Sequence, residues 1–209
     1  TSTTDGAQES RFVGGSQEIS IRMAKRLGKR VVLNAPVRRI EQQGNTCRVV
    51  SDKGTDKAKQ VIVAVPAAVS AFIDFDPILP FDRAQLIQRF PQGSAIKVQA
   101  VYNKPFWRDE GLSGYVNSDV GPVKLMYDNS PPDGSRGVLL GFIEGQEARR
   151  AGKMSPGARK SAVLECFKRT IGPEAGKPKQ YVEKNWATEE WTRGCYGGFL
   201  PPGVLTDYG

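Results

Sequence analysis

Residues 94–102 follow a two-residue alternation, and this pattern limits the folds that the chain can adopt. One set of positions is apolar, whereas the other set carries Lys97 and Gln99. Successive side chains of a β-strand point to opposite faces of the sheet, so the alternation predicts a strand with one buried face. The apolar positions are Ile96, Val98, Ala100 and Tyr102. Such a strand needs a sheet and a layer that covers its apolar face.

Other segments supply the partner strands of this sheet and the layer that covers it. Strands are predicted at residues 123–127, 138–143 and 180–186. The first two flank a Pro- and Gly-containing turn at residues 129–134, which indicates a hairpin with a long loop. Helices are predicted at residues 81–90 and after Ser155, where Pro156 fits the first turn and Gly172-Pro173 ends the helix. The apolar stripe of the second helix is Val163, Leu164, Phe167 and Ile171. We therefore expect an α+β fold, with a mixed or antiparallel sheet and covering helices.

The sequence of the N-terminal third predicts part of a second layer, of α/β type, separate from the α+β sheet described above. A helix is expected after Gly14-Gly15, with Ser16 as N-cap and Gly28 at its end. Its one-sided apolar positions are Ile19, Met23 and Leu27. Strands are expected at residues 30–33, 37–42, 46–51 and 61–65. The last is a continuous apolar run ended by Pro66, which is typical of a strand buried on both faces.

Composition excludes several classes of function. The chain contains no histidine, so we expect no Ser-His-Asp or Cys-His machinery and no metal site. The net charge of +8 is spread over scattered lysines and arginines, so we expect no nucleic-acid binding. The sequence contains no apolar run of about 18 residues, so it predicts no membrane span. Three widely spaced cysteines fit a reducing compartment, so we expect a cytoplasmic protein.

Two features could carry chemistry, and each has an ordinary alternative. Lys97 fits either a solvent-exposed strand position or a cavity beside a cofactor, where it could hold a water. Residues 185–199 contain four aromatic side chains and a glycine-flanked Cys195. This segment fits either an aromatic-rich core loop or a close approach to a flat group, to which Cys195 could be covalently linked. Gly14-Gly15-Ser16 could hold an anion at the helix start, but a simple cap explains it as well.

The order of several motifs resembles the flavin-containing amine oxidases of the monoamine oxidase family. The strongest match runs from Asn185-Trp186 through Gly194-Cys195-Tyr196 to residues 199–203. The resemblance extends over nearly the whole chain and covers the central part of the family's sequence. The other matching segments are residues 12–16, Pro36-Val37, and residues 61–66, 93–98, 104–108 and 141–143.

This resemblance implies FAD as the cofactor and gives roles to particular residues. Cys195 would carry the flavin if the link is covalent, Trp186 would pack against its ring system, and Val37 would meet the adenine through its backbone. Lys97 would hold a water near flavin N5, and Tyr196 would form one wall of an aromatic cage. The positions that would line the substrate cavity are Gln8, Asn117, Leu125 and Phe142. Leu125 replaces an aromatic gate of some members.

The resemblance also implies a reaction and a domain arrangement. An amine would be oxidised to an imine and then an aldehyde, with O2 reduced to H2O2. Residues 1–66 would belong to an FAD-binding domain, residues 67–184 to a substrate-binding domain, and residues 185–209 would return to the FAD-binding domain. Neither end carries a start or stop signal, so we expect cuts in a longer chain and an inactive isolated piece. The alternative is a non-catalytic binding domain that reuses this fold, and a homo-oligomer also fits.

Overall fold

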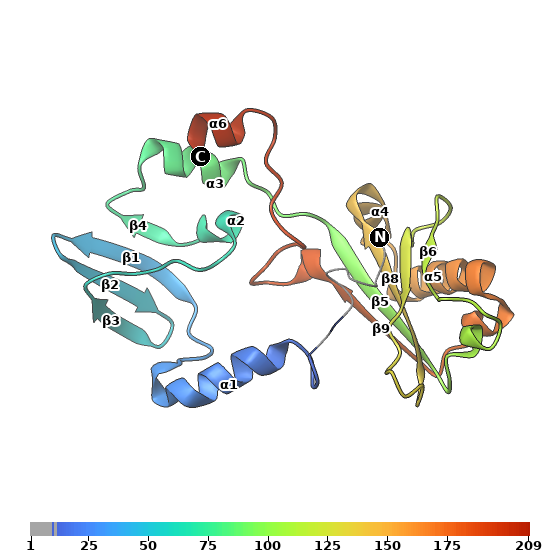
Figure 1. The fold of residues 1–209 in the computed structure, drawn as a ribbon. Coiled ribbons are helices and arrows are strands. Elements are labelled where there is room, and N and C mark those ends of the chain that lie inside the picture. Colours follow the sequence, from blue (N-terminus) through green and yellow to red (C-terminus); the bar gives the residue numbers. More distant parts are fainter. Residues whose placement is uncertain (1–9, 11) are drawn as a thin grey trace. The chain divides into compact units, whose positions relative to one another are not determined.

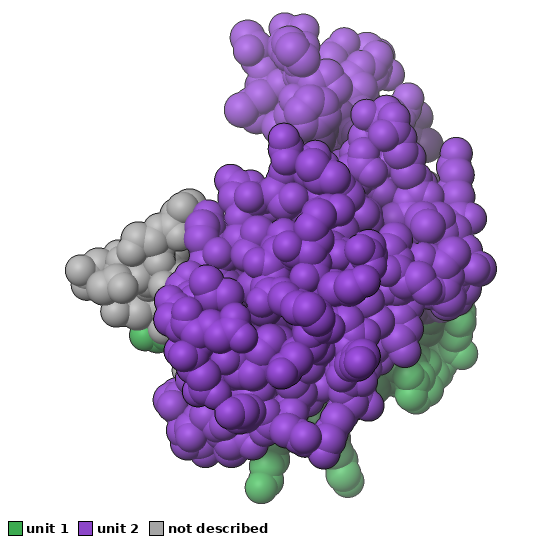
Figure 2. Space-filling model, turned by 90° about the vertical axis from the view of Figure 1, so that its right-hand side faces the viewer, with its two compact units in different colours: residues 1–61 green, residues 62–209 purple. Residues whose placement is uncertain are grey.

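The computed structural model describes residue 10 and residues 12–209, and it divides the chain into two compact units. The first unit ends at Val61 and the second runs from Ile62 to Gly209 (Figures 1 and 2). Gln8, which we expected to line the substrate cavity, lies outside the described residues.

The first unit contains one helix and an antiparallel ladder of three strands. Helix α1 (Gln17–Leu27) is followed by the 3-10 turn η1 (Gly28–Arg30). Strand β2 (Thr46–Ser51) pairs with β1 (Val37–Gln43) on one side and β3 (Gly54–Ala58) on the other. The turn between β1 and β2 uses Gly44, whose φ of 57° is a conformation that glycine adopts without a Cβ clash. The predicted α1, β1 and β2 are confirmed, whereas the polar β3 showed no alternation that could predict it.

Two details of this unit differ from our predictions. Residues 30–33 form no strand: a 3-10 turn ends at Arg30, and Leu33 is 70% exposed. The Ser16 side chain makes no capping hydrogen bond, although α1 begins directly after it. The apolar side chains of α1 are exposed, and none of its residues is buried. Local periodicity predicts a helix and its apolar face correctly, but it does not supply the surface that would cover this face.

The second unit is built on a five-stranded antiparallel sheet in the order β6-β7-β8-β5-β9. Its central strand pair is β5 (Ala95–Tyr102) and β8 (Gly137–Glu144). Strand β7 (Leu125–Asp128) forms the predicted hairpin with β8 and also pairs with β6 (Val116–Asn117). Strand β9 (Gln180–Asn185) pairs with the free edge of β5.

Helix α5 (Pro156–Ile171) supplies much of the apolar core on one face of this sheet (Figure 1). Ser155 caps it by accepting a hydrogen bond from the Ala158 N–H at 3.3 Å, as predicted. Phe167 approaches the sheet closely over Gly141, where a Cβ atom would lie 3.1 Å from its ring. Helix α4 (Gly145–Ala151) and the 3-10 turn η3 (Pro173–Gly176) flank α5. The α+β prediction, an antiparallel sheet with covering helices, is therefore confirmed.

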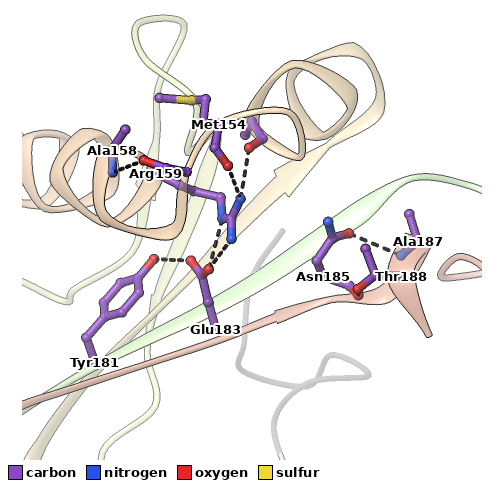
Figure 3. Close-up of polar contacts among 10 residues, drawn as sticks. Met154, Ala158, Arg159, Tyr181, Glu183, Asn185, Ala187 and Thr188 are labelled. Carbon is purple, nitrogen blue, oxygen red and sulfur yellow. Dashed lines mark hydrogen bonds and ion pairs between the residues drawn. The ribbon is translucent and has the colours of Figure 1, made fainter.

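A buried arginine joins α5 to the edge strand of the sheet (Figure 3). Arg159 donates hydrogen bonds to Glu183 and to the carbonyl oxygens of Ala151 and Met154. Tyr181 donates to the other carboxylate oxygen of Glu183 at 2.9 Å. Burial opposes ionisation of Glu183, but the hydrogen bonds from Arg159 and Tyr181 outweigh it and lower the pKa of this carboxyl group. These contacts fix β9 and the segment that follows it.

The remaining elements of this unit are short. They are α2 (Ala67–Ser70), β4 (Asp74–Asp76), α3 (Phe81–Gln88), η2 (Phe106–Arg108), η4 (Trp186–Thr188) and α6 (Val204–Tyr208). Helices α3 and α6 lie side by side (Figure 1), and Arg89 sits 5.1 Å from the ring centroid of Tyr208. The sequence gives no helix signal at the C-terminus, because the five-residue α6 is too short to show a sequence period. No helix of the described residues has the length and apolarity needed to cross a membrane.

The predicted buried strand at residues 61–65 is also wrong. These residues form no strand, and Ile62 is 92% exposed. A strand that is buried on both faces needs partner strands and covering layers. Within the part of the chain that is described, no strand is paired with this segment. The apolar run shows only that the segment could be buried.

Candidate active site

One transverse row of residues crosses all five strands of the sheet in the second unit. The pairing register places Leu125 opposite Phe142, and Phe142 opposite Lys97. Residues directly opposite each other in antiparallel strands project from the same face of the sheet. Four of the residues expected from the family resemblance therefore share one face. The full row, from β6 to β9, is Asn117, Leu125, Phe142, Lys97 and Lys184.

This face is the one that α5 leaves free, and we call it the open face. The neighbouring residues on β5, Ile96 and Val98, point into the core on the other side and are fully buried. Lys97 is half-buried, and its Nζ lies 5.7 Å from the centroid of the Phe142 ring. A cation above an aromatic face is attracted by the ring quadrupole. Lys97 is therefore an ammonium group held against an aromatic surface rather than an extended, freely solvated side chain.

A series of aromatic rings continues across the open face. Tyr127 lies 6.0 Å from Phe142, and Phe142 lies 5.9 Å from Tyr196, between ring centroids and with tilted planes. Tyr115 extends the series, 5.3 Å from Tyr127. Sequence reasoning did not single out Tyr115 or Tyr127. Tyr127 could have been found, because it stands two residues after Leu125 on one strand and therefore shares its face.

The backbone that precedes β5 holds the segment carrying Cys195 and Tyr196. The Cys195 N–H donates to the Gly93 carbonyl oxygen at 3.0 Å, and the Gly93 N–H donates to the Gly197 carbonyl oxygen at 2.9 Å. A Cβ atom on Gly93 would lie 2.6 Å from the Cys195 carbonyl oxygen, so only glycine fits without a backbone shift. The peptide bond between Cys195 and Tyr196 is cis. This clamp fixes both residues beside the row.

Charges near this clamp act on both side chains. Burial raises the pKa of the Cys195 thiol, the Lys97 ammonium opposes this increase, and the Glu144 carboxylate adds to it. Burial and the Glu144 carboxylate together raise the pKa of Tyr196. Cys195 and Tyr196 therefore both stay protonated at neutral pH.

Trp186 follows the edge strand β9 directly. Asn185 caps the turn η4, because its side chain accepts a hydrogen bond from the Ala187 N–H at 3.1 Å (Figure 3). Lys184 places its Nζ 5.8 Å from the centroid of the Trp186 ring and forms an ion pair with Glu189. Since Lys184 stands opposite Lys97, this ion pair offsets the repulsion between two neighbouring cations.

Val37 lies in the other unit, at the start of β1 and beside an irregularity in the pairing with β2. The structure therefore brings together seven of the nine expected site residues in one unit. These are Asn117, Leu125, Phe142, Lys97, Trp186, Cys195 and Tyr196.

Comparison with known proteins gives this face its context. A family model described as flavin containing amine oxidoreductase matches residues 2–209. The chain belongs to this family. The resemblance inferred from the sequence is confirmed, and the family is one of flavin-dependent oxidoreductases.

The family's named members are amine oxidases. The chain is 44% identical over 206 residues to the probable flavin-containing monoamine oxidase A of Dictyostelium discoideum, covering 98% of this chain and 45% of that protein. It is 42% identical over 212 residues to a flavin-containing amine oxidase of Oncorhynchus mykiss, covering 100% of this chain and 41% of that protein. The chain thus spans less than half the length of these relatives.

Solved structures of two amine oxidases are also similar to this chain. Wild-type putrescine oxidase bound to putrescine matches with a TM-score of 0.90 at 40% identity, covering 94% of this chain and 44% of that one. Cyclohexylamine oxidase from Brevibacterium oxydans IH-35A matches with a TM-score of 0.87 at 32% identity, covering 93% and 43%. Over the matched residues, this chain therefore has the same fold as these two proteins.

The open face fits a flavin in its chemistry. It combines a thiol, an ammonium group and exposed aromatic rings, which suit an attachment point, a polar partner and walls for a flat ring system. In the same segment, the buried Thr192 Oγ1 has no hydrogen-bond partner among the described residues. A buried hydroxyl without a partner is costly, so a polar group from outside this part of the chain is expected there.

Proposed function

We propose that the full-length protein is an FAD-dependent amine oxidase that converts an amine to an imine, which hydrolyses to an aldehyde. The observation that carries the proposal is the shared face of Lys97, Phe142, Cys195 and Tyr196 in a chain of this family. When bound, FAD supplies the two-electron chemistry that oxidises the amine and reduces O2 to H2O2.

Three side chains act on the reacting groups in this proposal. Tyr196 and Phe142, with their rings 5.9 Å apart, form aromatic walls that orient a neutral amine. Lys97 holds a water near the reacting part of the cofactor, because its ammonium group lies on the same face as these rings.

Three residues hold the cofactor. Cys195 provides a thiol for a covalent link, and its position is fixed by the clamp with Gly93. Trp186 packs against the flavin ring system, with its ring orientation set by the Lys184 cation. Val37 meets the adenine end through its backbone, which lies beside the irregular pairing of β1 with β2.

The substrate is a small amine whose apolar part lies along the aromatic series. Asn117, Leu125 and Phe142 follow one another across β6, β7 and β8 and form this part of the proposed cavity. Gln8 is proposed as a fourth contributor. Leu125 leaves more room than an aromatic side chain would. The proposal divides the chain into an FAD-binding part at residues 1–66, a substrate-binding part at residues 67–184, and a return segment at residues 185–209.

A peroxide-release screen of the full-length protein tests the proposal. Aromatic monoamines, aliphatic monoamines and diamines are supplied in turn, and H2O2 is measured together with bleaching of the flavin absorbance in the absence of oxygen. We expect a yellow protein that releases H2O2 with at least one class. A colourless protein that resists reconstitution with FAD would instead favour a non-catalytic binding domain.

A further inference from the structure

Glu144 is a charged side chain of the open face to which the family roles above assign no task. It ends β8, two residues after Phe142, and therefore projects from the same face of the sheet. Its register partner on β5 is Ala95, and the adjacent Gly145 N–H donates to the Ser94 carbonyl oxygen at 2.9 Å. Glu144 is half-buried and forms no ion pair with any residue that the structure describes.

Tyr196 reaches the same place from the other side of β5. The backbone of its neighbour Cys195 is bound to Gly93, two residues before Ala95. Gly93 has no side chain and Ala95 has only a Cβ atom, so neither residue carries a bulky side chain at this end of the sheet. The Phe142 ring, which contacts Tyr196 at 5.9 Å, closes a third side. The pairing register and the clamp therefore place Glu144 and Tyr196 at the same end of β5, where the charge of the carboxylate raises the pKa of the Tyr196 hydroxyl.

The other titratable groups around Tyr196 come from three different segments. Lys97 of β5 is held over Phe142, Tyr127 of β7 packs its ring against Phe142, and Cys195 stays a thiol. The second lysine of the row, Lys184, is paired with Glu189. Glu144 is thus the carboxylate whose charge acts on Tyr196, and no ion pair joins it to a cation in the described part of the chain.

We propose that Glu144 is a positioning residue for Tyr196: its carboxylate accepts the phenol hydrogen bond, fixes the ring on the open face and makes the ring more electron-rich. This inference rests on the proposed function, in which Tyr196 is a wall of the amine site. An electron-rich ring attracts positive charge more strongly. Since positive charge develops on the amine nitrogen as the imine forms, the Glu144–Tyr196 pair would favour the transition state over the bound neutral amine.

The first test measures flavin reduction by an amine substrate in the full-length protein under anaerobic stopped-flow conditions. We expect Glu144→Leu to slow the reduction about fivefold, a loss in the range of one cation–π contact, and Glu144→Gln to lie between this variant and the parent. In a Tyr196→Phe background, Glu144→Leu should have almost no further effect. Glu165→Leu, at an exposed position of α5, is the matched control and should leave the rate unchanged.

A second measurement does not depend on turnover. Fluorotyrosine placed at position 196 reports its own hydrogen bonding and ionisation through its 19F resonance. Glu144→Gln should shift this resonance and lower the pKa of the fluorophenol, whereas Glu165→Leu should change neither. If the resonance and the pKa are unaffected by Glu144→Gln, or if Glu144→Leu acts equally in both backgrounds, the positioning role is refuted. A protein that oxidises no amine but shows the 19F response would contradict the proposed function alone.

Discussion

Replacing Lys97 tests whether this residue lies beside the cofactor and holds a water, or is an ordinary solvent-exposed strand residue. Methionine has a similar length and packs well over Phe142, so Lys97→Met should leave the thermal unfolding temperature nearly unchanged. Without the ammonium group the bound water is lost, and we expect flavin reduction or reoxidation to slow by roughly 10- to 100-fold. Lys168→Met, at an exposed i,i+3 pair of α5, serves as control. Unchanged rates in both half-reactions would make Lys97 an ordinary strand residue.

Cys195 has an equally direct test. We expect a thioether in which Cys195 Sγ replaces one hydrogen of the flavin 8α methyl group. After acid precipitation of the full-length protein, the flavin should stay in the pellet and be found by mass spectrometry on the peptide that contains Cys195. In Cys195→Ser, the flavin should appear in the supernatant, because a non-covalent cofactor is held only by the folded site. Flavin released from the fully loaded parent protein would exclude the link and leave the family assignment intact.

The clamp between the start of β5 and the Cys195 segment makes the site sensitive to a single methyl group. Gly93→Ala would place a Cβ atom 2.6 Å from the Cys195 carbonyl oxygen, so one of the two backbones must move. We expect a loss of about 1–3 kcal/mol in unfolding free energy, together with a lower fraction of covalently bound flavin.

Gly157 offers the matched control for this substitution. It lies in the first turn of α5, and a Cβ atom there would meet nothing within 4 Å. Gly157→Ala should be neutral or stabilising by up to about 1 kcal/mol, because alanine favours the helix. Urea unfolding of the three proteins measures both effects. Equal stability of Gly93→Ala and the parent would show that the clamp is looser than the hydrogen bonds indicate.

We expect residues 1–209 to contain only part of the proposed cofactor site. The chain covers 45% and 41% of two amine oxidase relatives, and Val37 belongs to a different compact unit from Cys195 and Trp186. We therefore expect residues 1–209, expressed alone, to purify without stoichiometric FAD and to release no H2O2 with amines. Absorbance near the flavin bands, with the full-length protein as reference, measures the cofactor content. Tightly bound flavin in the isolated residues would show that the site is complete within them.

The strands and the long helix of the second unit were predictable because their signals are local. Alternation at residues 94–102 and the capped stripe of α5 depend only on near neighbours in the chain. The site residues Lys97, Phe142, Cys195 and Tyr196 were named through the family resemblance. Their shared face was not predictable in that way, because it depends on the register of strands that are far apart in the sequence.

By itself, the sequence determined the α+β class, most strand and helix positions, and the family to which the chain belongs. Only the tertiary structure decided that residues 61–65 form no buried strand, that α1 exposes its apolar face, and that α6 packs against α3. It also decided that Glu144, paired with Ala95, and Tyr196, whose neighbour Cys195 is bound to Gly93, come to the same end of β5. The physical reason is the same in each case. A local pattern fixes which face of a segment is apolar or charged, whereas its burial and its partners depend on distant segments that the pattern does not contain.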